Sequence, residues 1–131
     1  MTSEGLITIP SNFGPEETVN RLEKEIISQG INVFAHIDHA AGAGGVGMTL
    51  RPTTVILFGN PRGGTPFMQA NQTIGIDLPL KALVWEDASG KTFLSYNDPA
   101  WLAKRHGITG LERATTTMSA ALNTIATKST K

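Results

Sequence analysis

The stretch LVWEDASGKTFLSY, residues 83–96, decides the fold class predicted for this chain of 131 residues. Apolar and aromatic residues stand at both of its ends, and a polar segment with Gly90 near its end lies between them. This pattern is typical of a β-hairpin, two antiparallel strands joined by a turn. Because a hairpin pairs segments that are neighbours in the chain, it favours an antiparallel sheet.

Three further strands are predicted before the hairpin. Residues 53–58, TTVILF, are continuously β-branched or apolar. They fit a central strand covered on both faces, or covered by a helix on one face and by a partner on the other. Residues 31–39 alternate with a period of two, and residues 6–9 form a short strand closed by Pro10.

Helices are predicted at about residues 15–29, at residues 66–71 as one or two turns, and from Pro99 to a stop at Gly107. A helix of four turns follows the capping-box spacing of Thr109 and Glu112, and its polar tail is expected to fray. An apolar stripe runs along this last helix, formed by Leu111, Ala114, Met118, Ala121, Leu122 and Ile125.

Residues 40–48 contain four glycines and three alanines, and we expect a tight loop there. They include the letters G-x-G-x-x-G of a dinucleotide-binding loop. That loop needs a helix opening at its third glycine, whereas Pro52 and another strand follow here. The sequence therefore gives little support to nucleotide binding.

The order of elements predicts an α+β fold, an antiparallel sheet of about five strands with helices packed on one face.

Eleven basic and eleven acidic residues give a formal net charge of zero, which argues against nucleic acid as the partner. The chain has no cysteine, which excludes thiolate catalysis, zinc–thiolate sites and iron–sulfur clusters. Its apolar stretches are strand-sized and its first ten residues lack a basic region. We therefore expect one cytoplasmic domain over residues 1–131, with no membrane partner.

One candidate metal site is the cluster of His36, Asp38 and His39 at the end of the second strand. Imidazole and carboxylate groups are metal ligands, although a metal would need a further ligand such as Asp77, Glu86 or His106. The alternative is that Asp38 caps the following backbone while His39 donates to a strand carbonyl. We favour this structural interpretation over metal or acid/base chemistry.

The other candidate site is the stretch GNPRGGTP, residues 59–66. A strand end followed by glycines, a guanidinium, a hydroxyl and a helix start can gather donors around an anion. In the alternative, Asn60 forms a side-chain-bonded turn and Thr65 caps the short helix. The residues leave both interpretations open for a small anion and disfavour catalysis.

Five segments together resemble a known family: Ile37-Asp38-His39, Leu50-Arg51-Pro52-Thr53, Phe58-Gly59-Asn60-Pro61 with Gly64-Thr65-Pro66, Asp77-Leu78-Pro79-Leu80-Lys81, and Val84-Trp85-Glu86-Asp87. They are similar to those of DUF302, a family of small bacterial and archaeal proteins of unknown function. The resemblance runs from about Glu16 to Ile108. It implies a TBP-like fold, in which a curved antiparallel sheet carries helices on one face, and a homodimer. Relatives often have a short helix with larger residues after the position of His39, where this chain is rich in glycine.

Three functions follow from the residues and the resemblance. The first is a dimeric, non-catalytic binding or sensing module for a small anionic ligand or metal, held between the two candidate clusters. The second is an enzyme with His39 as general acid or base, and the third is a structural domain for protein–protein interaction. The residues identify no cofactor. The candidate ligand-binding residues are Asp38, His39, Asn60, Arg62, Gly64, Thr65 and Asp77.

Overall fold

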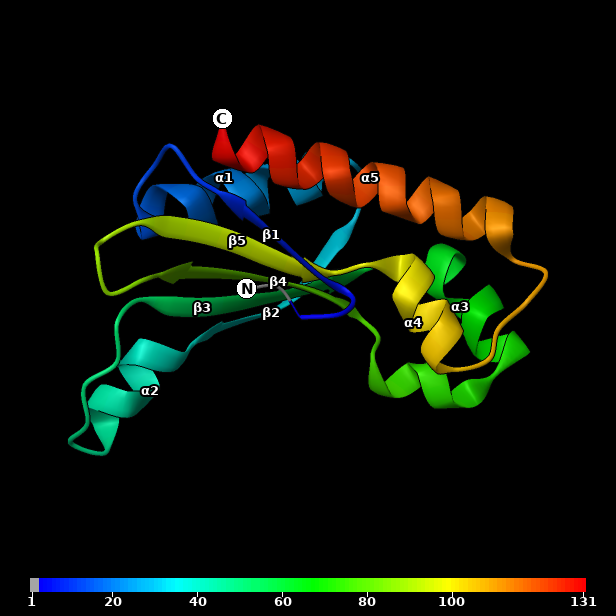
Figure 1. Cartoon of the computed structure of the whole chain (residues 1–131), viewed down its shortest axis with the longest axis horizontal. Helices are drawn as coiled ribbons and strands as arrows, with labels where there is room; N and C mark the ends of the chain where they lie inside the picture. The colour runs from blue at the N-terminus through cyan, green and yellow to red at the C-terminus, as the bar shows by residue number, and fades with distance from the viewer. Residues whose placement is uncertain (1–2) are drawn as a thin grey trace.

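The computed structural model describes residues 3–131 and contains one five-stranded antiparallel sheet in the order β1-β5-β4-β3-β2 (Figure 1). The α+β prediction is therefore confirmed. The elements are β1 (Leu6–Pro10), α1 (Pro15–Ser28), β2 (Asn32–Asp38), α2 (His39–Gly45), β3 (Thr53–Gly59), α3 (Pro61–Ala70), the 3₁₀ helix η1 (Gln72–Ile76), β4 (Leu80–Glu86), β5 (Thr92–Asn97), α4 (Pro99–Arg105) and α5 (Glu112–Thr130).

The predicted hairpin forms from β4 and β5, and β4 is the middle strand of the sheet. Trp85 faces Phe93 across the two strands, and their rings stack with centroids 4.9 Å apart. The turn is held by Asp87, whose Oδ1 accepts hydrogen bonds from the backbone N–H groups of Ser89 and Lys91. On one side of the hairpin, β4 pairs with β3 and β3 pairs with the edge strand β2. On the other side, β5 pairs with the edge strand β1.

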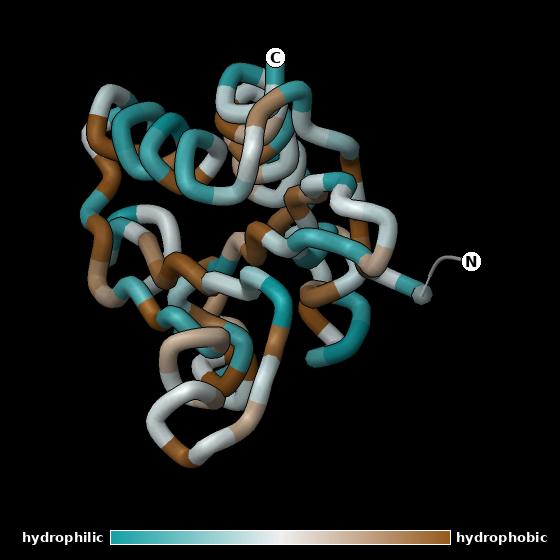
Figure 2. The backbone as a smooth tube through the Cα atoms, turned by 90° about the vertical axis from the view of Figure 1, so that its left-hand side faces the viewer, coloured by the Kyte–Doolittle hydropathy of each residue, from teal (hydrophilic) through white to brown (hydrophobic). Residues whose placement is uncertain are grey.

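Helices α1 and α5 lie side by side over one face of the sheet (Figures 1 and 2). Ile56, Phe58, Val84 and Leu94 point into this layer and are almost fully buried. The two helices cover them with a common apolar set: Val19, Leu22, Ile26, Leu122, Ile125 and Ala126. This layer is the main hydrophobic core.

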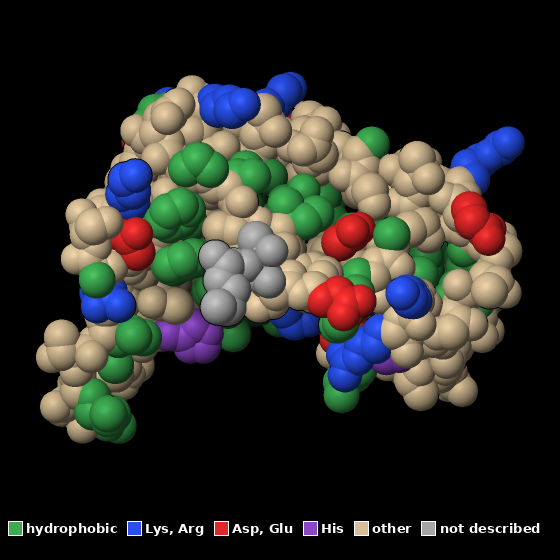
Figure 3. Space-filling view, viewed as in Figure 1, with side chains coloured by type: hydrophobic (Ala, Val, Ile, Leu, Met, Phe, Trp, Pro, Cys, Tyr) green, Lys and Arg blue, Asp and Glu red, His purple; other side chains and the backbone are tan. Residues whose placement is uncertain are grey.

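No helix of the described residues lies over the middle of the opposite face (Figure 1). Because side chains alternate along a strand, Val55, Leu57, Leu83, Trp85 and Phe93 point to this side, and all five are only half-buried. We call these five residues the open face. Figure 3 shows the molecule hollowed beneath the sheet. The coverage of β3 by helices on one face is confirmed, and the expected partner on its other face stays a prediction.

A second, smaller apolar cluster joins α3, η1 and α4 at one end of the sheet. Phe67, Ile74 and Leu102 form its centre, and Met118 of α5 contacts both clusters. Gly5, with φ +77°, brings the start of the chain against the indole of Trp101. The cluster therefore fixes α3 and α4 relative to α5 and the sheet.

Residues 39–45 form helix α2, so the prediction of a loop there was wrong. Asp38 is the N-cap of this helix and accepts a hydrogen bond from the N–H of Ala41 at 2.9 Å. The cap and the alanines outweigh the helix-weakening glycines. α2 and the following residues 46–50, which we call the arm, project from the sheet with Val46 74% and Met48 67% exposed (Figures 1 and 3).

Two helices begin or end elsewhere than predicted. α3 begins at Pro61 rather than Pro66, because Asn60 and not Thr65 is its N-cap. The capping box of Thr109 does not form, and the Glu112 carboxylate instead accepts from the N–H of Gly110. The tail is not frayed: α5 continues to residue 130, where the Thr130 carbonyl accepts from the N–H of Asn12.

Candidate functional site

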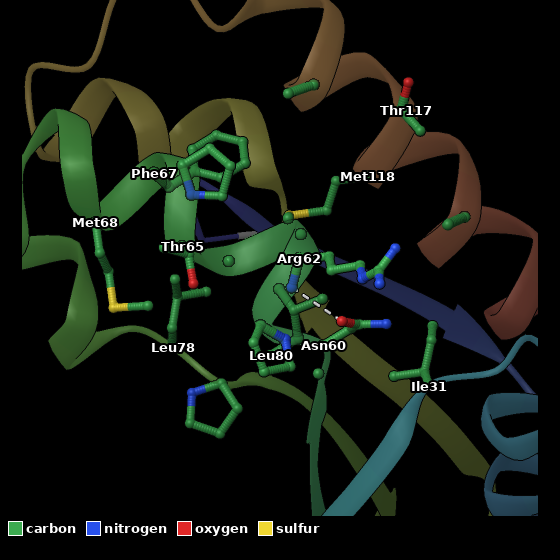
Figure 4. A pocket seen from close by; sticks show the side chains of 18 of the residues that line it. Ile31, Asn60, Arg62, Thr65, Phe67, Met68, Leu78, Leu80, Thr117 and Met118 are labelled. Atoms are coloured by element: carbon green, nitrogen blue, oxygen red, sulfur yellow. Dashed lines mark hydrogen bonds between the residues drawn. The ribbon is translucent and has the colours of Figure 1, made fainter.

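A groove of about 780 Å³ lies where the ends of β3 and β4 meet α3 and α5 (Figure 4). This volume is in the range of small-molecule sites, roughly 300–1,000 Å³. The walls are mostly apolar: Phe58, Leu80, Leu122 and Ile125 come from the core, and Met68, Leu78, Ala114, Met118 and Ala121 from its edge. The apolar stripe of α5, predicted from the sequence as packing, therefore also forms a wall of this groove.

Small residues on the two facing helices keep the groove open. Gly63 and Gly64 stand on α3, while Ala114 and Ala121 stand on α5. A Cβ added at Gly63 would meet no atom within 4 Å, and one at Gly64 would meet Leu78 Cδ1 at 3.6 Å. Larger side chains at these positions would occupy the space between the helices.

Asn60 forms the turn between β3 and α3, which is part of the groove lining. Its Oδ1 accepts from the N–H of Arg62 at 2.9 Å, and its carbonyl accepts from the N–H groups of Gly63 and Gly64. These bonds use the backbone donors at the start of α3. The structural interpretation of this turn is confirmed for Asn60, and any anion here must be bound by side chains.

Side-chain donors are present beside this turn. The Arg62 guanidinium and the Asn60 amide project together toward the space between Ile31 and α5 (Figure 4). Within residues 3–131, no carboxylate forms an ion pair with Arg62. Thr65 lies in the next turn of α3, and its hydroxyl also lines the groove. Four of the candidate residues, Asn60, Arg62, Gly64 and Thr65, therefore share one site.

Asp77 lies outside this groove and binds α4 instead. One nitrogen of Arg105 donates to both of its carboxylate oxygens, at 2.8 and 2.7 Å, and the His106 ring contacts Oδ2 at 2.5 Å. Burial by itself raises the pKa of Asp77, but the hydrogen bond from His106 and the charge and hydrogen bond of Arg105 together lower it. Asp77 therefore anchors the segment whose next residues, Leu78 and Pro79, line the groove.

The network around His106 was not predicted from the sequence. The other ring nitrogen, Nδ1, lies 2.8 Å from the Thr73 hydroxyl, and the His106 carbonyl accepts from the Asn71 amide at 2.6 Å. These residues are about thirty positions apart in the sequence. No spacing rule connects them, so only their proximity in the fold could reveal the network.

His36, Asp38 and His39 lie at the opposite end of the sheet. In the pairing of β2 and β3, Asp38 faces Thr54, whereas Asn32 faces Gly59 beside the groove. Because β3 extends for seven residues at about 3.3 Å each, the two clusters cannot hold one small ligand together. The expectation of a shared site was therefore wrong.

His36, Asp38 and His39 have three different surroundings in the structure. His36 Nδ1 lies 2.7 Å from the Glu23 carboxylate on α1, Asp38 caps α2, and His39 is the exposed first residue of that helix. No group of three or more His, Asp or Glu side chains that could hold a metal ion is found within residues 3–131. The structure thus gives the metal interpretation no assembled ligand set.

Comparison with known proteins finds related sequences that are longer than this chain. It is 52% identical over 104 residues to proteins named "Fluoride-specific ion channel FluC 1" from Brucella suis biovar 1 and from Brucella abortus biovar 1. The match covers 79% of this chain but only 41% and 38% of those proteins, so the chain spans about two fifths of the relatives' length. Within residues 3–131, no helix has the length and apolar character needed to cross a membrane.

A solved structure has the same fold. The crystal structure of an uncharacterized conserved DUF302 protein from Bacillus stearothermophilus superimposes with a TM-score of 0.85 at 20% identity, covering 96% of this chain and 98% of that one. The sequence pattern of the family described as "Domain of unknown function DUF302" matches residues 7–125. The chain therefore belongs to the DUF302 family.

Proposed function

We propose that this protein is a dimeric, non-catalytic binding module whose groove takes a small anionic ligand at Arg62. The observation that supports the proposal most is an arginine without a carboxylate partner in residues 3–131, in the lining of a groove of about 780 Å³. Guanidinium groups bind carboxylates and phosphates through paired hydrogen bonds. The Asn60 amide supplies a further donor beside it, and Thr65 lies elsewhere in the lining of the same groove.

Binding fits the groove better than acid/base catalysis. No histidine, aspartate or glutamate of the described residues lines it, so no side chain there has the usual form of a general base. The alternative enzyme would use His39 as general acid or base, and His39 directly follows Asp38. The Asp38 carboxylate is engaged by the N–H of Ala41, at the far end of β3 from the groove.

The open face supports the dimeric part of the proposal. An antiparallel sheet with one face in water carries polar residues on that face, whereas Leu57, Leu83 and Trp85 are apolar here. Five strands spaced about 4.8 Å apart, each about six residues long, present roughly 480 Å² on one face. A stable interface takes about 800 Å² from each partner, and the arm with Val46 and Met48 provides additional apolar surface. A second copy packed against the open face and the arm would cover both.

A second candidate function is favoured by the Brucella relatives, in which a closely similar segment is part of proteins named fluoride channels. As this second function, we propose that the domain associates with a fluoride channel. Size-exclusion chromatography of the chain mixed with a purified fluoride channel in detergent would test it. Co-elution supports this role, and separate elution contradicts it.

The anion site is tested by titrating the protein with butyrate, followed by amide chemical shifts. We expect shifts around the groove that Arg62→Ala abolishes. Arg51→Ala is the matched control, because Arg51 is an exposed arginine before the start of β3, at the other end of that strand. Unchanged binding by the Arg62 variant would contradict the proposal. Native mass spectrometry with and without a chelator measures the dimer and any retained metal in the same preparation.

A further inference from the structure

We propose that the ligand of the groove is an amphipathic acid, a carboxylate on an unbranched hydrocarbon chain. This inference rests on the proposed anion site and extends it from the head of the ligand to its tail. Its basis is the contrast within the groove: the guanidinium of Arg62 projects between Ile31 and α5, and apart from Arg113 and a few polar side chains the lining is apolar. A small inorganic anion would leave that lining exposed to water.

The apolar lining comes from three segments. Met68 of α3, Met118 of α5 and Leu78 before β4 are half-buried and line the groove. Half-buried apolar side chains in a groove are typical of a binding site. They continue inward to Phe58 and Leu122, which belong to the main core, so a hydrocarbon chain entering here would extend the core.

The walls also fit a flexible chain better than a rigid ring. Two methionines, Met68 and Met118, come from α3 and α5 and lie on either side of Thr65 and Phe67 in the close-up view (Figure 4). Methionine has three rotatable bonds and adapts to ligands of varying length. The aromatic residues of the groove, Phe34, Phe58 and Phe67, form no ring stack with one another.

Charge complementarity selects the head group. Arg62 and Arg113 are the only ionisable side chains among the described residues that line the groove, and both are cations. Neither forms an ion pair within residues 3–131. A neutral amphiphile such as an alcohol would leave Arg62 without a counter-ion, so the acid is the preferred ligand. The groove holds a single chain of this kind rather than a membrane surface, because its volume is that of a small-molecule site.

The experiment is a calorimetric titration of the full chain with butyrate, octanoate, decanoate and 1-decanol. Each methylene buried in the groove should tighten binding about three- to fourfold, until the chain fills the available length. We expect decanoate to bind far more tightly than butyrate, and 1-decanol more weakly than decanoate. Arg62→Ala should strongly weaken the binding of decanoate, and Arg51→Ala should leave it unchanged.

Two variants place a larger side chain in the groove to test the tail of the ligand. Ala121→Phe fills the groove from α5, and we expect it to weaken the binding of decanoate more than that of butyrate. Gly63→Leu serves the same purpose should the first variant fail to fold, because a Cβ at Gly63 meets no atom within 4 Å. Circular dichroism checks the fold of each variant.

The outcomes separate the two proposals. Chain-length dependence that Ala121→Phe or Gly63→Leu removes supports the amphipathic ligand. If butyrate and decanoate bind equally and Arg62→Ala abolishes both, the hydrocarbon chain of the ligand is contradicted and the anion site is supported. Equal binding of decanoate and 1-decanol, unaffected by Arg62→Ala, overturns the anion site. An absence of binding by all four compounds overturns both.

Discussion

Asp77 and Arg105 form the ion pair that joins the segment before β4 to the end of α4, with one guanidinium nitrogen 2.8 and 2.7 Å from the two carboxylate oxygens. His106 contacts the same carboxylate, so two neighbouring residues of one segment share one partner. Leu78 and Pro79 follow Asp77 directly and line the groove. The pair therefore holds a wall of the proposed site in place without itself contacting the ligand.

Replacing Asp77 with Asn should destabilise the fold by roughly 1–3 kcal/mol at neutral pH, because the charged acceptor for Arg105 and His106 is lost. The pKa of Asp77 is lowered from 3.8 in the folded state. Its stabilising contribution is thus fully present above that value and is lost as the pH falls through the lowered pKa. Urea unfolding at about pH 7 and about pH 2 should show a difference between wild type and variant that shrinks in acid. An equal difference at both values would contradict this role.

Replacing Gly5 with Ala should destabilise the protein by about 2–4 kcal/mol, for two reasons. The residue has φ +77°, and an added Cβ would overlap the indole of Trp101. Gly30→Ala is the matched control: Gly30 has φ +75°, but a Cβ there meets no atom within 4 Å. We expect the control to lose about 1–2 kcal/mol in the free energy of unfolding, from the backbone conformation alone. Equal losses in denaturant unfolding would show that Trp101 does not constrain Gly5.

Replacing Leu57 with Glu should convert the proposed dimer to a monomer, because it places a charge in the middle of the open face. Light scattering after size-exclusion chromatography measures the mass directly. Ile27→Glu is the control, since Ile27 is an exposed apolar residue on α1, a helix over the opposite face. A Leu57 variant that keeps the mass of the wild type would place the interface elsewhere.

His39→Ala should leave ligand binding at the groove unchanged, because β3 separates the two sites along its full length. Asp38→Ala should also leave binding unchanged while lowering stability by about 1 kcal/mol through loss of the α2 cap. Calorimetric titration and thermal unfolding of both variants measure these two effects. Loss of binding in His39→Ala with intact stability would restore the cluster of His36, Asp38 and His39 as the functional site.

Local patterns in the sequence predicted most of the fold. The hairpin of residues 83–96, the apolar strand at residues 53–58 and the amphipathic helices each follow from short-range periodicity. Helix α2 was not predicted because the glycines of this segment favour a loop. The N-cap residue Asp38 stabilises the helix in spite of that composition. The buried tail at Ser129 and Thr130 was missed because its burial depends on contacts with the start of the chain, which no local pattern encodes.

The candidate site was predicted only in part, for the same physical reason. Asn60, Arg62, Gly64 and Thr65 are adjacent in sequence, so a motif could identify them together. Asp38 and His39 were grouped with them although the antiparallel register places them at the other end of the sheet. The facing wall on α5 lies about fifty residues further along the chain, and only the packing of helices brings it to the groove.

Binding in the groove between α3 and α5 is tested by a titration of ¹⁵N-labelled protein with decanoate. We expect amide shifts at Gly63, Gly64 and Thr117 that saturate together, with the signals of α2 unmoved. Saturating shifts confined to α2, or no shifts at any decanoate concentration below micelle formation, would contradict it.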